Sequence, residues 1–99
     1  MGIYKIINIS HSGKKGTRGL HRTDGRYPLR VGRTVRLDIE HTDVGMPLIL
    51  EYVKDENGND YSAYYLRCSI IQGINFIGDK TGCIETNNTI YEFEKQEEI

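Results

Sequence analysis

Residues 27 to 40 alternate between apolar and polar side chains, and this alternation constrains the fold more than any other feature of the chain. Most odd positions are apolar, namely Leu29, Val31, Val35, Leu37 and Ile39. Most even positions are polar, namely Arg30, Thr34, Arg36, Asp38 and Glu40. Because successive side chains of a strand point to opposite faces, the stretch predicts a strand with one face on a core and the other in water.

Arg33 breaks this alternation, because it falls on the apolar phase directly after Gly32. An unpaired guanidinium group is very costly to bury. We therefore expect the backbone to bend or bulge at Gly32-Arg33. Pro28 suits the start of the strand, where its missing N–H does no harm.

The rest of the chain contains further strand and turn patterns. We expect strands over residues 3–10, 48–53, 61–77, 83–86 and 89–94, joined by turns at 41–47, 55–60, 78–82 and 87–88. Asn57-Gly58 in the second turn is the strongest short hairpin signal. In 61–77 the even positions form the predicted inward face, namely Tyr64, Leu66, Cys68, Ile70, Ile74 and Phe76. Gln72 interrupts that face, and Gly73 predicts a bend.

These patterns predict an all-β fold, a small antiparallel barrel of five to six strands joined mainly by hairpins and similar in shape to SH3-like or OB-like barrels. Eleven glycines against two prolines, with abundant Val, Ile, Thr and Tyr, favour strands and tight turns over helices. Ninety-nine residues fit one domain, residues 1–99. Within it we expect a mobile basic loop at 11–26 and a frayed charged tail at 95–99. The only helix candidate is a short turn near 41–46.

Charge is divided sharply along the chain. Residues 1–36 hold nine Lys and Arg against one acid, Asp24, whereas residues 37–99 hold thirteen Asp and Glu against four Lys and Arg. The two parts carry +8 and −9, which gives the net charge of −1. Asymmetry of this size indicates polyanion binding or head-to-tail pairing.

The first functional hypothesis is a non-enzymatic module that binds nucleic acid or another polyanion. The predicted phosphate contacts lie in the glycine-rich basic loop and are Lys14, Lys15, Arg18, Arg22 and Arg26. Arg30 and Arg36 form the predicted floor of the groove, and Tyr4 and Tyr27 are predicted to stack on bases. Three alternatives stay open: pairing of the two charged halves within the molecule, a homo-oligomer or acidic protein partner, and a metal-independent ribonuclease using His11, His21 and Lys15.

A P-loop, a metal site and a disulfide scaffold are excluded because the sequence lacks the residues or the spacing that each of them needs. Gly16 is followed by Thr17 without the lysine of a phosphate-binding P-loop, and no helix pattern follows. The histidine spacing matches no metal motif, and two cysteines are too few for a disulfide scaffold or a four-cysteine zinc site. No cofactor is predicted. Without a signal-peptide pattern or a membrane span, we expect a cytoplasmic protein with reduced Cys68 and Cys83; these two become neighbours if their strands pair.

The runs 66–71 and 84–93 resemble those of small bacterial β proteins. This resemblance covers less than a third of the chain and is explained by hairpin chemistry. It implies no activity, cofactor or site residue.

Overall fold

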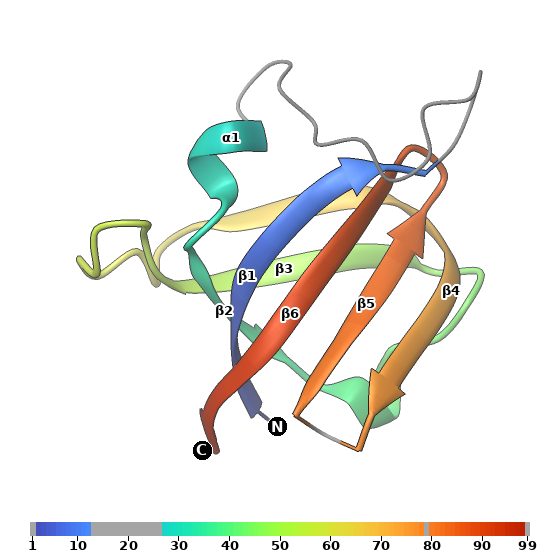
Figure 1. Cartoon of the computed structure of the whole chain (residues 1–99). Helices are drawn as coiled ribbons and strands as arrows, with labels where there is room; N and C mark the ends of the chain where they lie inside the picture. Colours follow the sequence, from blue (N-terminus) through green and yellow to red (C-terminus); the bar gives the residue numbers. More distant parts are fainter. Residues whose placement is uncertain (1, 13–26, 79, 99) are drawn as a thin grey trace.

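The protein is a closed barrel of six antiparallel strands, in which each strand pairs with the next along the chain and β1 pairs with β6 (Figure 1). The computed structural model describes residues 2–12, 27–78 and 80–98. The strands are β1 (Gly2–His11), β2 (Thr34–Leu37), β3 (Pro47–Lys54), β4 (Tyr65–Ile77), β5 (Thr81–Thr86) and β6 (Thr89–Glu98). The prediction of a small all-β antiparallel barrel is confirmed.

The pairing of β1 with β6 closes the barrel. Its register runs from Gly2 opposite Glu98 to His11 opposite Thr89, with two register shifts along the way. Residues 95–98, which the sequence predicts to fray, continue β6 beside the start of β1. The backbone N–H of Lys95 also donates to the carbonyl of Lys80 at 2.6 Å, which ties this end of β6 to the β4–β5 turn.

A single apolar core fills the barrel. Its buried members come from all six strands and are Tyr4, Ile6, Ile9, Val35, Leu37, Leu48, Leu50, Tyr52, Ile71, Ile84, Tyr91 and Phe93. Each fully buried aliphatic or aromatic side chain of this size contributes about 1.5–3 kcal/mol. In β3 the buried side chains are Leu48, Leu50 and Tyr52, and the exposed positions between them face outward.

The stretch 27–40 forms a much shorter strand than the alternation predicts. Residues Tyr27–Arg30 form a short helix, α1, and only Thr34–Leu37 form a strand, in which Val35 and Leu37 are buried as predicted. Pro28 starts a helix because its fixed φ suits the first helical turn, so its placement at a strand start is wrong. The predicted core position Val31 is exposed because it lies in the turn after α1.

The predicted bend at Gly32-Arg33 is confirmed. Gly32 has a φ of 96°, a conformation that glycine adopts without steric cost. The bend is held against β1, because the N–H of Gly32 donates to the carbonyl of Ile6 at 2.8 Å and the N–H of Ile6 donates to the carbonyl of Arg33 at 2.9 Å. The second helical turn, η2 (Ile39–His41), precedes the position at which the sequence suggested one.

Two register shifts change which residues of β4 face the core. One lies between Arg67 and Ile70 in the pairing with β3, and the other between Ile71 and Gly73 in the pairing with β5. Leu66, Cys68, Ile74 and Phe76 pack on the core as predicted. Ile71, at 1% exposed, joins them, whereas Tyr64 is exposed and the prediction that it faces inward is wrong. Each shift moves the inward phase by one residue.

Gly82 gives a test of the β4–β5 register. It lies opposite Phe76, and a Cβ added to Gly82 would lie 2.3 Å from the Phe76 ring and 2.6 Å from the Asn75 carbonyl oxygen. We expect Gly82→Ala to lower the free energy of unfolding by about 1–3 kcal/mol, because the ring must move. Urea denaturation followed by circular dichroism measures the change.

The matched control for this test is Gly73→Ala. A Cβ at Gly73 meets nothing within 4 Å, although this glycine also lies in the β4–β5 ladder. Equal destabilisation by the two substitutions would show that Phe76 does not cover Gly82.

Candidate functional site

The structure separates the two predicted groove arginines that it describes. Arg30 ends α1, whereas Arg36 lies on the outer face of β2. The expectation that both lie on a single strand is therefore wrong, whereas their predicted role in nucleic-acid binding stays a prediction; they line different pockets. The predicted phosphate contacts of the loop lie outside the described residues and stay predictions: Lys14, Lys15, Arg18, Arg22 and Arg26.

Exposed tyrosines occur in the structure, but they are not the predicted ones. Tyr4 is only 2% exposed and packs edge-on against Phe76, with ring centroids 5.7 Å apart, so it offers no face to a base. The side chain of Tyr27 lies outside the described residues. Tyr64 and Tyr65, at the start of β4, are 59% and 68% exposed.

These two tyrosines belong to an outer-face patch that crosses β2, β3 and β4. We define the patch as Arg36, Ile49, Glu51, Tyr64, Tyr65 and Arg67, all of which are exposed. Strand register places Arg36 opposite Glu51, Glu51 opposite Tyr65, and Ile49 opposite Arg67. A depression of about 400 Å³ lies at the centre, between Arg36 on one side and Tyr64 and Tyr65 on the other. The patch therefore combines aromatic, aliphatic and cationic groups on one surface.

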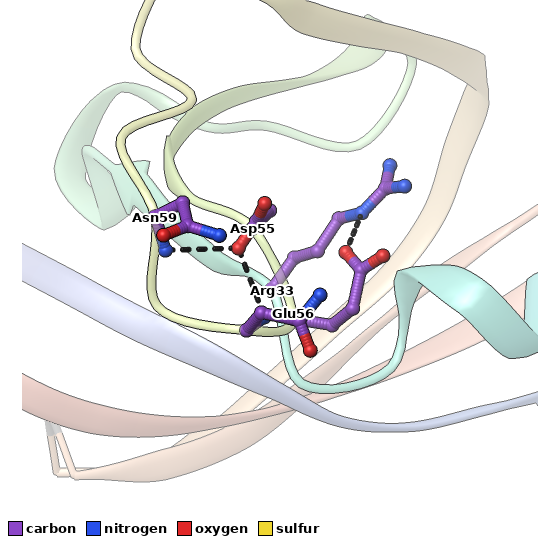
Figure 2. A network of polar contacts seen from close by, with 5 residues as sticks. Arg33, Asp55, Glu56 and Asn59 are labelled. Atoms are coloured by element: carbon purple, nitrogen blue, oxygen red, sulfur yellow. Dashed lines mark hydrogen bonds and ion pairs between the residues drawn. The ribbon is translucent and has the colours of Figure 1, made fainter.

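The connection between β3 and β4 holds the tyrosines in place. A carboxylate oxygen of Asp55 accepts hydrogen bonds from the backbone N–H groups of Asn57 and Asn59, both at 2.9 Å. Figure 2 shows the Asp55 side chain inside this turn. Gly58 has a φ of 84°, so the turn predicted at Asn57-Gly58 is confirmed.

Arg33 anchors this connection to the barrel. Its guanidinium lies over the rings of Tyr52 and Tyr61, 5.1 and 5.0 Å from their centroids, and its Nε lies 3.0 Å from a carboxylate oxygen of Glu56 (Figure 2). Tyr61 in turn stacks on Tyr64, with ring centroids 4.6 Å apart. Cation–π contacts of partly buried arginines contribute about 0.5–2 kcal/mol each. Arg33, which breaks the alternation of the sequence, therefore supports the outer-face patch through the stacking of Tyr61 on Tyr64.

Strand pairing also places basic residues of the first part of the chain opposite acids of the second. Lys5 lies opposite Glu94, Arg36 opposite Glu51, and Arg33 forms its ion pair with Glu56. This arrangement accounts for part of the charge asymmetry within the molecule. Although Arg36 lies opposite Glu51, it forms no salt bridge with a carboxylate of the described residues. The same is true of Arg67.

A second pocket, which we call the mouth pocket, has a volume of about 260 Å³. It lies at the end of the barrel where Figure 1 shows α1 and the β5–β6 turn. Its lining consists of two arginines, several polar residues and two less polar ones: Arg30, Arg67, Ser69, Thr86, Asn88, Thr89, Tyr91, Leu66 and Cys68. β4 pairs with β5 only from Ile71 onward, which leaves residues 66–69 free to line this opening.

The two cysteines lie apart, although β4 and β5 pair as expected. Cys83 is opposite Asn75, seven residues along β4 from Cys68, and both thiols are free. The thiol of Cys68 donates to the Tyr91 hydroxyl at 3.4 Å, and burial raises the pKa of this thiol. Cys68 is therefore a protonated lining residue of the mouth pocket at neutral pH.

The histidines of the ribonuclease hypothesis are not brought together by anything in the described residues. His11 ends β1 and His21 lies outside the described residues, while the third histidine, His41, belongs to η2. Among the residues that the structure describes, no group of three His, Cys, Asp or Glu is placed to hold a metal ion. Within the same residues, no helix has the length and hydropathy needed to cross a lipid bilayer.

Comparison of the chain with protein-family models, with curated proteins and with solved structures gave no match. The outer-face patch and the mouth pocket share Arg67, which lies two residues after Tyr65 on β4.

The carboxylates of the β3–β4 connection make stability dependent on pH. The backbone N–H of Asn59 holds the pKa of Asp55 below its usual range, and the backbone N–H of Ser62 does the same for the pKa of Asp60. A carboxyl whose pKa is lower in the folded state stabilises fully above its unfolded pKa of about 3.9, and this contribution is lost as the pH falls through the folded value. We expect the free energy of unfolding to decrease from about pH 5 downward.

Asp55→Asn isolates this effect, because its amide oxygen can accept the same two hydrogen bonds but does not titrate. Urea denaturation at a series of pH values should show a shallower decrease in unfolding free energy for this variant than for the wild type. Parallel pH profiles would contradict the role given to Asp55.

Proposed function

We propose that the protein is a non-enzymatic binding module that holds single-stranded nucleic acid across its outer-face patch. The observation that supports this proposal is the pair of exposed tyrosines, Tyr64 and Tyr65, beside Arg36 and Arg67. Aromatic rings stack on bases of any sequence, and arginines neutralise the phosphates between them.

The spacing of these groups suits a nucleotide chain. Arg67 follows Tyr65 by two residues on the same face of β4, about 7 Å along the strand. Arg36 lies two strands away from Tyr65, about 10 Å across the sheet. A base stacked on Tyr65 therefore has an arginine within reach on each of two sides.

Glu51 lies between Arg36 and Tyr65, and its negative charge disfavours the binding of a polyanion. Its charge would repel a phosphate in the depression, so the patch favours a path along its edges, where the arginines are. Removing this charge should strengthen binding. The role of the predicted loop contacts stays a prediction.

A protein partner is the second candidate for the same surface. Ile49 is 47% exposed beside the two tyrosines, and tyrosine and arginine are enriched at protein interfaces. The sequence suggested an acidic protein or a second copy of the chain as such a partner. Nucleic-acid binding separates the two candidates, because a protein interface does not hold unrelated oligonucleotides.

The test is fluorescence anisotropy of labelled single-stranded DNA and RNA at about 50 and 200 mM salt. We expect binding that weakens steeply at the higher salt. Tyr65→Ala should weaken it by about 1–3 kcal/mol, roughly 5- to 150-fold, through loss of one stacked base. Glu51→Gln should tighten it, and Arg36→Gln should weaken it and reduce its salt dependence.

Two controls define the result. Tyr65→Phe keeps the ring and should bind like the wild type, and Ile77→Ala removes an exposed apolar side chain at the far end of β4 and should also have no effect. Absence of binding at micromolar protein in low salt would reject the nucleic-acid proposal in favour of a protein partner. Binding that is indifferent to Tyr65→Ala would show that the nucleic acid does not lie across the outer-face patch.

A further inference from the structure

Glu51 is a charged residue of the outer-face patch that phosphate binding does not explain. It is exposed on β3, and strand register places it opposite Arg36 of β2 on one side and opposite Tyr65 of β4 on the other. Neighbouring strands are about 4.8 Å apart, so these three outward side chains form a row across the sheet. A carboxylate at the centre of this row weakens the binding of a polyanion unless it contacts another part of the ligand.

The carboxylate of Glu51 is available to a ligand. No hydrogen bond or salt bridge joins it to another of the described residues, and it forms no ion pair with Arg36, although the two residues lie opposite each other. Pairing with a neighbouring side chain therefore does not account for its charge. Glu51 lines the depression of about 400 Å³ together with Tyr64 and Tyr65. From there it can accept hydrogen bonds from a group that stacks on the tyrosines.

The depression suits a base better than a phosphate. Its volume lies within the range of about 300–1,000 Å³ of pockets that hold small molecules, so one base fits into it. Ile49 and the rings of Tyr64 and Tyr65 give it apolar walls, and the charge of Glu51 repels phosphate oxygens. A nucleotide bound here would therefore place its base in the depression and its phosphates near the arginines at the edges of the patch.

Guanine is the base whose hydrogen-bond donors match a carboxylate. An ionised carboxylate only accepts hydrogen bonds, and its two oxygens can accept from two donors that lie side by side. The Watson–Crick edge of guanine carries N1–H and the N2 amino group next to each other. Adenine, cytosine, thymine and uracil instead place a ring nitrogen or a carbonyl oxygen beside their donor, and this acceptor repels one carboxylate oxygen. In a single strand the Watson–Crick edge is unpaired and open to contact.

We propose that Glu51 makes the outer-face patch selective for guanine. A guanine base stacks on Tyr65, and its N1–H and N2 amino group donate to the two carboxylate oxygens of Glu51. This inference rests on the proposed binding of single-stranded nucleic acid and adds the base that the patch selects. Stacking and phosphate contacts supply affinity for any sequence, whereas Glu51 supplies the preference for one base.

The test compares labelled oligothymidylates that carry one central guanine, hypoxanthine, adenine or thymine, measured by fluorescence anisotropy. We expect the guanine oligonucleotide to bind about fivefold or more tightly than the adenine one, which controls for the stacking of a purine ring. Hypoxanthine lacks the N2 amino group of guanine and should give an intermediate affinity. Because the contact is to a base and not to a phosphate, the ratio of affinities should be equal at about 50 and 200 mM salt.

Four variants separate the contact to the base from the effect of charge. Glu51→Gln should abolish most of the preference for guanine over adenine and tighten binding of the all-thymine oligonucleotide, because it removes a repulsive charge together with the paired acceptors. Glu51→Asp keeps the carboxylate and should keep a preference for guanine. Glu94→Gln is the matched control, since it removes the same charge from an exposed position of β6 outside the patch and should change neither quantity. Arg67→Gln should weaken binding of all four oligonucleotides alike.

The outcomes distinguish failure of this inference from failure of the proposed function. Equal binding of the guanine oligonucleotide and either the hypoxanthine or the adenine one would overturn the inference, as would a guanine preference that survives Glu51→Gln. Either result leaves the proposed function intact if Tyr65→Ala still weakens binding. Absence of binding of every oligonucleotide would overturn both.

Discussion

The pairing of β1 with β6 is the interaction on which the rest of the structure depends. It joins the first and last strands of the chain along nearly their whole length and removes the two open edges that a six-stranded meander would leave. Closure also completes the core, because Tyr4, Ile6 and Ile9 of β1 meet Tyr91 and Phe93 of β6 inside the barrel. Without it, the apolar faces of both strands would be exposed to water.

β1 also holds the segment that connects α1 to β2, and two arginines of this segment contribute to the candidate surfaces. The β1 backbone at Ile6 holds the bend after α1, and this places Arg30 at one end of the barrel and Arg33 beneath the β3–β4 connection. Arg33 then supports Tyr61, which stacks on Tyr64 of the outer-face patch. The two surfaces share β4, on which Arg67 belongs to the outer-face patch and also lines the mouth pocket.

Local patterns in the sequence predicted the barrel but not its site. Alternation identified Val35 and Leu37 as core residues, and Asn57-Gly58 identified a turn, because both depend on neighbouring residues. The sequence could not predict which residues of β4 after Arg67 face the core. The reason is that the register shifts of β4 depend on its neighbouring strands, β3 and β5. The sequence also could not predict the environment of Arg33, because its contacts Glu56 and Tyr61 lie more than twenty residues away along the chain. Tyr64 and Tyr65 were visible as an aromatic run, but the sequence pattern predicted Tyr64 to face inward, whereas both are exposed.

Amide hydrogen exchange of the ¹⁵N-labelled protein tests the closed barrel most directly. If β1 and β6 form the seam, the amides that pair these two strands will exchange as slowly as those of β3 and β4 and will be released together with them on global unfolding. Rapid exchange throughout β1 and β6, with β3, β4 and β5 still protected, would show an open sheet and contradict the closed barrel.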